Sequence, residues 1–158
     1  MTKTSDPIES LTEDIFLAFD DRLPPTDEEL LHPDCHDDVD ILQFYGGIYW
    51  QDMDDAMIVY NYAAPTAFSP KAFRYYLPAY LNWTLRNHDS IEYVSEAFLI
   101  SLDPGTSSEM LHQFRKSKFQ LLTSEQKQII KRFLNHLADH GNLAEFADNA
   151  LINYWAEV

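Results

Sequence analysis

Three observations predict an all-α fold, a compact single domain of about six or seven helices over residues 1–158. Apolar residues recur at the three- and four-residue spacing of one helix face through most of the chain. Capping boxes, in which a residue with a capping side chain is followed three positions later by glutamate or glutamine, precede several of these segments. No hairpin signal, such as an asparagine–glycine pair between alternating apolar runs, is visible. With 46% apolar residues, the chain can form a core without disulfides or metals.

The N-terminal region is predicted to form three helices that proline and glycine separate. The first covers residues 7–19, with Asp6 as its cap and Pro7 at a position that favours helix entry. A short helix is expected over residues 26–32, before Pro33, because proline disfavours helical geometry in the residue before it. The third is expected over residues 34–45.

Residues 50–62 are ambiguous because their run of apolar residues is short. The run fits a buried strand as well as a helical turn, so a short strand pair near residues 48–62 stays open. A helix is favoured because the neighbouring segments are helical.

The longest apolar and aromatic segment begins at Ser69-Pro70 and has Phe73 and Leu77 on one side. Pro78 lies inside it and removes a backbone hydrogen bond, which predicts a kink. The C-terminal part predicts four more helical segments. They are residues 90–102, a segment opened by Thr106 and Glu109, a segment opened by Thr123 and Gln126 that ends at Gly141, and a last one opened by Asn142 and Glu145.

Charge is unevenly distributed along the chain. The net charge is −15, and residues 1–64 hold 16 acidic and 2 basic side chains, a net of −14, whereas residues 65–158 have a net of −1. An acidic protein repels phosphate backbones, so direct nucleic-acid binding is not expected. It attracts basic partners and stays soluble.

The location predicted from the sequence is the cytoplasm. The start of the chain lacks a basic segment followed by an apolar run, so no secretory signal is visible, and no apolar stretch is long enough for a membrane span. Cys35 is the single cysteine, which excludes an internal disulfide.

Sequence motifs give little support for an enzyme. The chain has 4 glycines and contains no glycine-rich phosphate loop, no GxSxG, no HExxH and no paired CxxC. We therefore expect no cofactor and a binding protein in place of an enzyme.

One cluster can be read as a metal or hydrolase site. His32, Asp34, Cys35 and His36 supply nitrogen, sulfur and oxygen ligands at close spacing. The spacing matches no standard metal loop, and the aspartates fit equally well at a helix start, where they complement the helix dipole. Aspartates around Cys35 also raise the pKa of a thiol, which opposes a nucleophilic role. A metal-binding protein or hydrolase is kept as an alternative.

The segment from Ala67 to Leu81, AFSPKAFRYYLPAYL, resembles the signature F-L-T-P-E-A-F-R-Y-Y-L-P-A-F-L of an uncharacterised bacterial family, a domain of unknown function. A weaker similarity follows at residues 119–134, and Trp50 resembles a tryptophan that precedes the signature. The resemblance covers roughly residues 44–137. Ser69 and Lys71 replace the usual threonine and glutamate. The resemblance implies a small bacterial cytoplasmic protein and no catalytic residue.

The favoured function is a small acidic protein-interaction module, of the inhibitor or immunity type, that binds a basic protein surface. Arginine and tyrosine are frequent in interface hot spots. Two residues off the apolar face of the aromatic segment, an arginine and a tyrosine that we expect to be exposed, are therefore added to the acidic ones. The predicted partner-binding residues are Asp34, Asp37, Asp38, Asp40, Asp52, Asp54, Asp55, Arg74 and Tyr75. A structural homo-oligomerising domain, with Tyr75 or Tyr154-Trp155 packed against a second copy, is the other alternative.

Overall fold

The computed structural model describes residues 6–20, 23–31, 45, 47–90, 92–139 and 141–158. Within these residues it contains eight α-helices, four short 3-10 turns and no strand, which confirms the all-α prediction. The helices are α1 (Pro7–Ala18), α2 (Asp27–Leu30), α4 (Asp55–Tyr60), α5 (Pro70–Arg86), α6 (Val94–Leu102), α7 (His112–Ser117), α8 (Ser124–Ala138) and α9 (Ala144–Asn153), and the turns are η1 (Trp50–Asp52), η2 (Ala64–Thr66), η3 (Gly141–Leu143) and η4 (Trp155–Glu157).

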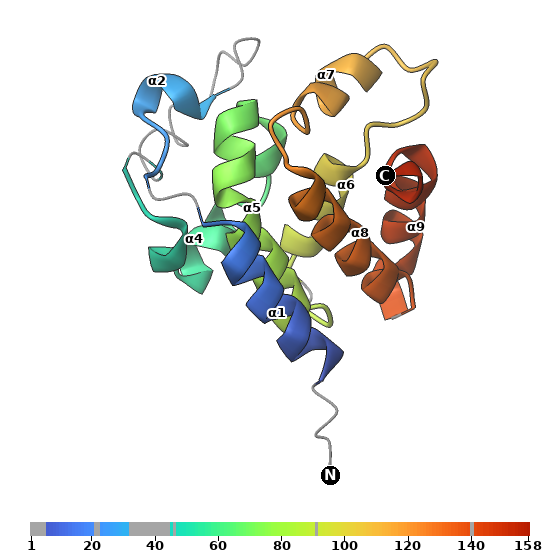
Figure 1. Cartoon of the computed structure of the whole chain (residues 1–158), viewed down its shortest axis with the longest axis horizontal. Helices are drawn as coiled ribbons and strands as arrows, with labels where there is room; N and C mark the ends of the chain where they lie inside the picture. Colours follow the sequence, from blue (N-terminus) through green and yellow to red (C-terminus); the bar gives the residue numbers. More distant parts are fainter. Residues whose placement is uncertain (1–5, 21–22, 32–44, 46, 91, 140) are drawn as a thin grey trace.

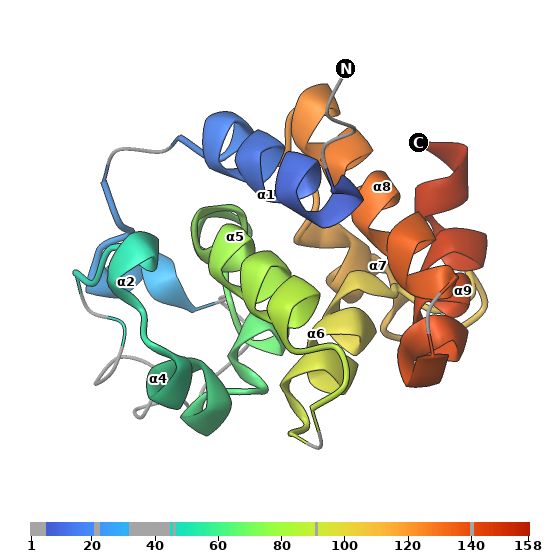
Figure 2. The same ribbon diagram turned by 90° about the horizontal axis from the view of Figure 1, so that it is seen from below.

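Helix α5 is the centre of the fold (Figures 1 and 2). It contacts α1, α2, α4 and α6, and nearly all of its side chains from Ala72 to Leu85 are buried. Helices α8 and α9 form a second packed pair, which meets the rest of the molecule through α1 and α6. The buried residues of both groups form one continuous core.

The predicted starts of α1 and α8 are confirmed by their capping side chains. Asp6 accepts a hydrogen bond from the backbone N–H of Ile8 at 3.1 Å, directly before α1. At α8 the capping box is complete, because Thr123 and Gln126 exchange side-chain-to-backbone bonds of 3.1 and 3.0 Å. The Gln126 amide also donates to the carbonyl of Ala18 at 3.0 Å, so one cap joins α8 to the end of α1.

Several predicted boundaries are wrong, and residues 48–62 form no strand pair. That stretch holds η1 and α4, so the helical interpretation was correct. Helix α5 continues through Pro78 to Arg86. Helix α6 begins at Val94, later than predicted, and α7 begins at His112, although the Thr106 N–H still bonds the Glu109 carboxylate at 3.0 Å. The helix predicted over residues 34–45 lies outside the described residues, apart from Tyr45.

Tyrosine hydroxyl groups of α5 hold the segment between residues 45 and 61 against this helix. The Tyr76 hydroxyl lies 2.9 Å from the carbonyl oxygen of Tyr45 and 2.8 Å from that of Ile48. The Tyr80 hydroxyl donates to the Asn61 carbonyl at 3.1 Å, so the hydroxyl of Tyr45, which is bonded to Tyr80, must be the donor in that pair. These bonds join buried polar groups that would otherwise be unsatisfied.

We predict that Tyr45, Tyr76 and Tyr80 remain protonated until the protein unfolds in alkali. Burial raises the pKa of each hydroxyl above its ordinary value of 10.0. The stability that these groups contribute is therefore complete below pH 10 and falls as the pH rises further, because only the unfolded chain releases their protons readily. Phenolate absorbance and far-ultraviolet circular dichroism, followed together, should show a late group of phenols that ionises as helicity is lost. Ionisation of all 9 tyrosines with the helices intact would contradict the prediction.

Candidate functional site

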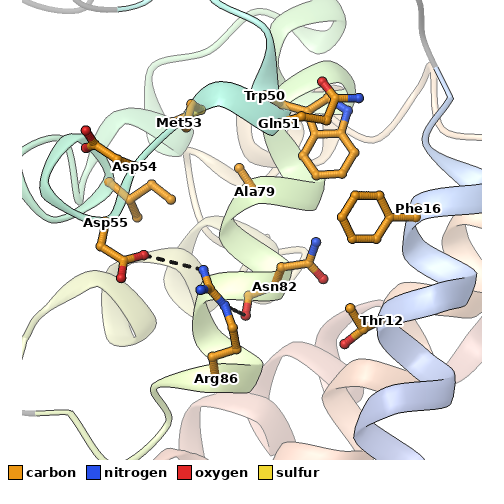
Figure 3. Close-up of a pocket in the computed structure, with 11 residues that line it drawn as sticks. Thr12, Phe16, Trp50, Gln51, Met53, Asp54, Asp55, Ala79, Asn82 and Arg86 are labelled. Atoms are coloured by element: carbon orange, nitrogen blue, oxygen red, sulfur yellow. Dashed lines mark hydrogen bonds and ion pairs between the residues drawn. The ribbon is translucent and has the colours of Figure 1, made fainter.

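A pocket of about 640 Å³ lies between α1, the η1–α4 segment and α5 (Figure 3). Its walls combine two aromatic side chains, apolar side chains, two carboxylates, two amides and a guanidinium group. The lining residues are Thr12, Phe16, Trp50, Gln51, Met53, Asp54, Asp55, Ile58, Ala79, Asn82 and Arg86.

Helical spacing places the side chains on two of the walls. Thr12 and Phe16 are four residues apart on α1 and so share one of its faces. Ala79, Asn82 and Arg86 follow one another by three and four residues along α5 and form a stripe beside the tyrosine face. The short side chain of Ala79 leaves space at one end of this stripe.

The third wall is the acidic turn from η1 into α4. Asp54 caps α4, because its carboxylate accepts the N–H of Met57 at 2.8 Å. Asp55 is exposed and lies 3.4 Å from the guanidinium of Arg86. The Nε of Arg86 donates to the backbone carbonyl of Asn82 at 3.3 Å, which keeps the guanidinium at the edge of the pocket. Asp52 is exposed on the adjoining turn.

Two buried polar atoms in the pocket walls have no hydrogen-bond partner among the described residues. They are the indole nitrogen of Trp50 and the amide oxygen of Asn82. Trp50 is 4% exposed and Asn82 9% exposed. Figure 3 shows the Asn82 amide pointing from α5 toward the wall that Thr12 and Phe16 form. An unsatisfied buried donor or acceptor opposes folding, so a ligand that reaches either atom after a local turn of the side chain would supply the missing bond.

The two halves of the chain are joined by ion pairs across their boundary. Three acids of the first 64 residues pair with bases of the second half, namely Asp14 with Arg132 at 2.7 Å, Asp55 with Arg86, and Glu29 with Lys71. The hydrogen bond from Lys71, assisted by Thr26, lowers the pKa of the Glu29 carboxyl to about 2. No lysine or arginine of the first half is among the described residues, whereas eleven carboxylates are. The acidic surface of this half is therefore only partly neutralised.

The predicted acidic site residues fall into two groups. Asp52, Asp54 and Asp55 are exposed, and the last two line the pocket. Predicted residues Asp34, Asp37, Asp38 and Asp40, together with His32, Cys35 and His36, lie outside the described residues. Elsewhere in the described chain, no group of three His, Cys, Asp or Glu residues is arranged to hold a metal ion.

The exposure predicted for Tyr75 is wrong. Its side chain is 3% exposed, and its hydroxyl accepts a hydrogen bond from the backbone N–H of Trp50 at 3.4 Å. Tyr75 therefore holds the Trp50 wall of the pocket in place. Arg74 is half-buried and donates to the Leu121 carbonyl at 3.2 Å. Trp155 is fully buried, which removes it as a contact for a second copy, and Tyr154 is partly buried and bonded to Lys127 at 2.8 Å.

The sequence analysis identified only Asp54 and Asp55 among the lining residues, and it missed Phe16, Trp50, Asn82 and Arg86 among others. One signal for them was available in the sequence. Phe16 falls off the apolar face of its helix, and Asn82 and Arg86 form a polar stripe on an otherwise apolar helix. The partner wall around Trp50 comes from a segment whose structure was ambiguous, so the sequence did not bring these residues together.

A family model described as a family of unknown function (DUF6714) matches residues 36–158. The match includes the η1–α4 and α5 walls of the pocket and leaves out α1. No curated protein and no solved structure matches the chain. Among the described residues, no helix combines the length and apolar character that crossing a bilayer demands.

We predict that replacing Trp155 with phenylalanine destabilises the protein more than the same replacement at Trp50. The indole N–H of Trp155 donates to the Leu102 carbonyl at 2.7 Å, so W155F leaves a buried acceptor unpaired. W50F removes a donor that has no partner in the described chain. The difference should be about 1–3 kcal/mol in the free energy of unfolding, measured by urea denaturation. Equal losses would show that the Trp50 N–H is satisfied in solution.

Proposed function

Because the chain belongs to a family of unknown function (DUF6714), whose description carries no activity, we propose from its own residues that it is a protein-interaction module that binds a basic protein surface. The observation that carries the proposal is the exposed acidic rim of the pocket. We define this acidic rim as Asp52, Asp54 and Asp55, three carboxylates within four residues.

The charge arrangement supports an interaction with a basic partner. Residues 1–64 have a net charge of −14, and only three of their described carboxylates pair with bases of the other half. Of the acidic rim, only Asp55 is in such a pair, and that pair is open to solvent, where screening makes it weak. A basic surface approaching the rim meets carboxylates that are accessible and poorly compensated, which increases the rate of encounter.

The pocket beside the rim supports a specific contact as well as attraction at a distance. Interfaces gain most of their affinity from a few side chains inserted into desolvated pockets, whereas charges at the rim act mainly on association rate. The acidic rim and the pocket are adjacent, so one partner can use both. The proposal includes a cytoplasmic location and a role of the inhibitor or immunity type.

We predict that reversing charge in the acidic rim weakens capture of a basic partner. The test compares the wild type, the double variant Asp52→Lys/Asp55→Lys and the control double variant Glu96→Lys/Asp148→Lys as baits in lysate of the source organism. The control changes the net charge equally at exposed positions of α6 and α9. Asp54 is left intact because it caps α4.

The proposal expects one basic protein that the wild type and the control retain, that the rim variant loses, and that salt releases. With the purified partner, the rim variant should associate about tenfold more slowly at low salt and show a weaker salt dependence. Equal retention by all three baits, or no salt-sensitive partner for the wild type, would contradict the proposed function.

A further inference from the structure

The pocket behind the acidic rim has an aromatic wall. The rings of Phe16 and Trp50 lie with centroids 5.0 Å apart and planes inclined by 44°. Phe16 is 51% exposed although it belongs to a large apolar residue type. Met53 adds apolar surface on the opposite side of the pocket, and Ile58 also lines the pocket. This combination accommodates a flat or slender group with an apolar stem.

The charges at the pocket favour a cation as that group. Asp54 and Asp55 bring two carboxylates and Arg86 one guanidinium, so one negative charge remains. Asp54 uses one oxygen to cap α4, and a carboxylate has acceptor sites left on its other oxygen. Aromatic faces also attract cations, most strongly when the faces belong to tryptophan.

The two unpaired buried atoms narrow the choice of cation. The Asn82 amide oxygen needs a hydrogen-bond donor, which a quaternary ammonium group cannot provide. A turn of the amide about its last bond exchanges the positions of oxygen and nitrogen at little steric cost, so the oxygen can face the pocket. The Trp50 N–H needs an acceptor, which peptide carbonyl groups supply and a free guanidinium ion lacks.

We propose, resting on the proposed function, that this pocket receives an arginine side chain of the basic partner. The guanidinium lies against the rings of Phe16 and Trp50 and donates to the Asn82 oxygen. The carboxylates of the acidic rim attract its charge from the other side of the pocket. The stem packs on Met53 and Ile58, and a backbone carbonyl of the partner accepts the Trp50 N–H. A lysine fits less well, because its compact ammonium is strongly hydrated and cannot stack on a ring.

The test is a titration of ¹⁵N-labelled protein with N-acetyl-arginine amide, which has the side chain and two carbonyl groups. The indole N–H signal of Trp50 reports on the pocket, and those of Trp83 and Trp155, both buried elsewhere in the core, serve as internal references. The W50F variant assigns the signal. N-acetyl-citrulline amide is the matched control ligand, because citrulline has the shape of arginine without its charge.

The proposal expects a saturable shift of the Trp50 signal alone, with arginine bound about tenfold or more tightly than citrulline and also more tightly than N-acetyl-lysine amide. Absence of a Trp50 shift with arginine, or equal affinity for citrulline, would overturn it.

Charge-neutral variants test the residues. D54N/D55N removes both carboxylates while asparagine still caps α4, and D27N/E28Q removes two exposed carboxylates of α2 as the control. The arginine response should disappear in the first variant and persist in the second. An arginine response that persists in both variants would overturn the assignment of the two pocket carboxylates to the arginine site.

The outcome is separable from that of the proposed function. Salt-sensitive capture of a basic partner without a Trp50 response would remove the arginine anchor and leave the interaction module. A Trp50 response without such a partner would leave an arginine pocket and remove the basic protein surface as its target.

Discussion

The contact of α5 with the segment from residue 45 to residue 61 is the constraint on which the rest of the site depends. That segment has two short helical stretches, η1 and α4, neither long enough to be stable alone. Its backbone groups are instead held by the hydroxyls of three tyrosines of α5, namely Tyr75, Tyr76 and Tyr80. Without these bonds, the wall that contains Trp50 and the acidic rim would have no fixed position relative to α5.

The same helix uses a neighbouring stripe for the pocket. Ala79, Asn82 and Arg86 lie next to the tyrosines along α5, so support and site are built on one rigid element. This arrangement explains why a helix of such aromatic content contains an asparagine at a buried position. A buried amide whose oxygen has no partner in the described part of the chain weakens the fold by itself, and such local weaknesses are typical of places where a protein interacts with something else.

The structure also changes the meaning of the charge asymmetry. In the sequence, the acidic first half and the near-neutral second half suggest two surfaces of different character. In the fold, arginines and a lysine of the second half reach across to acids of the first half, at Asp14, Glu29 and Asp55. Part of the asymmetry therefore attaches α1, α2 and α4 to the α5–α8 framework. The exposed carboxylates that remain, including the acidic rim, are what a partner meets.

The sequence predicted local features well and long-range ones poorly. The starts of α1 and α8 were predictable because Asp6 and Thr123 act on backbone groups two or three residues away. The start of α7 was not, because its capping-box pair forms without a helix following it directly. The resemblance to a family of unknown function is confirmed by the match to residues 36–158.

The wrong prediction of exposure for Tyr75 shows the physical limit of predicting burial from helical periodicity. Helical periodicity assigns a residue to a face, and Tyr75 lies off the main apolar face of α5. It is nevertheless buried, because a segment 25 positions earlier folds over it and bonds its hydroxyl. That segment covers a second side of α5, so residues that the sequence places on the surface are buried beneath it. The pocket lies where the edge of this segment meets α1 and α5. A pocket between segments distant in the sequence leaves no periodic signature in any one of them, so Trp50, Phe16 and the α5 stripe come together only in the folded molecule.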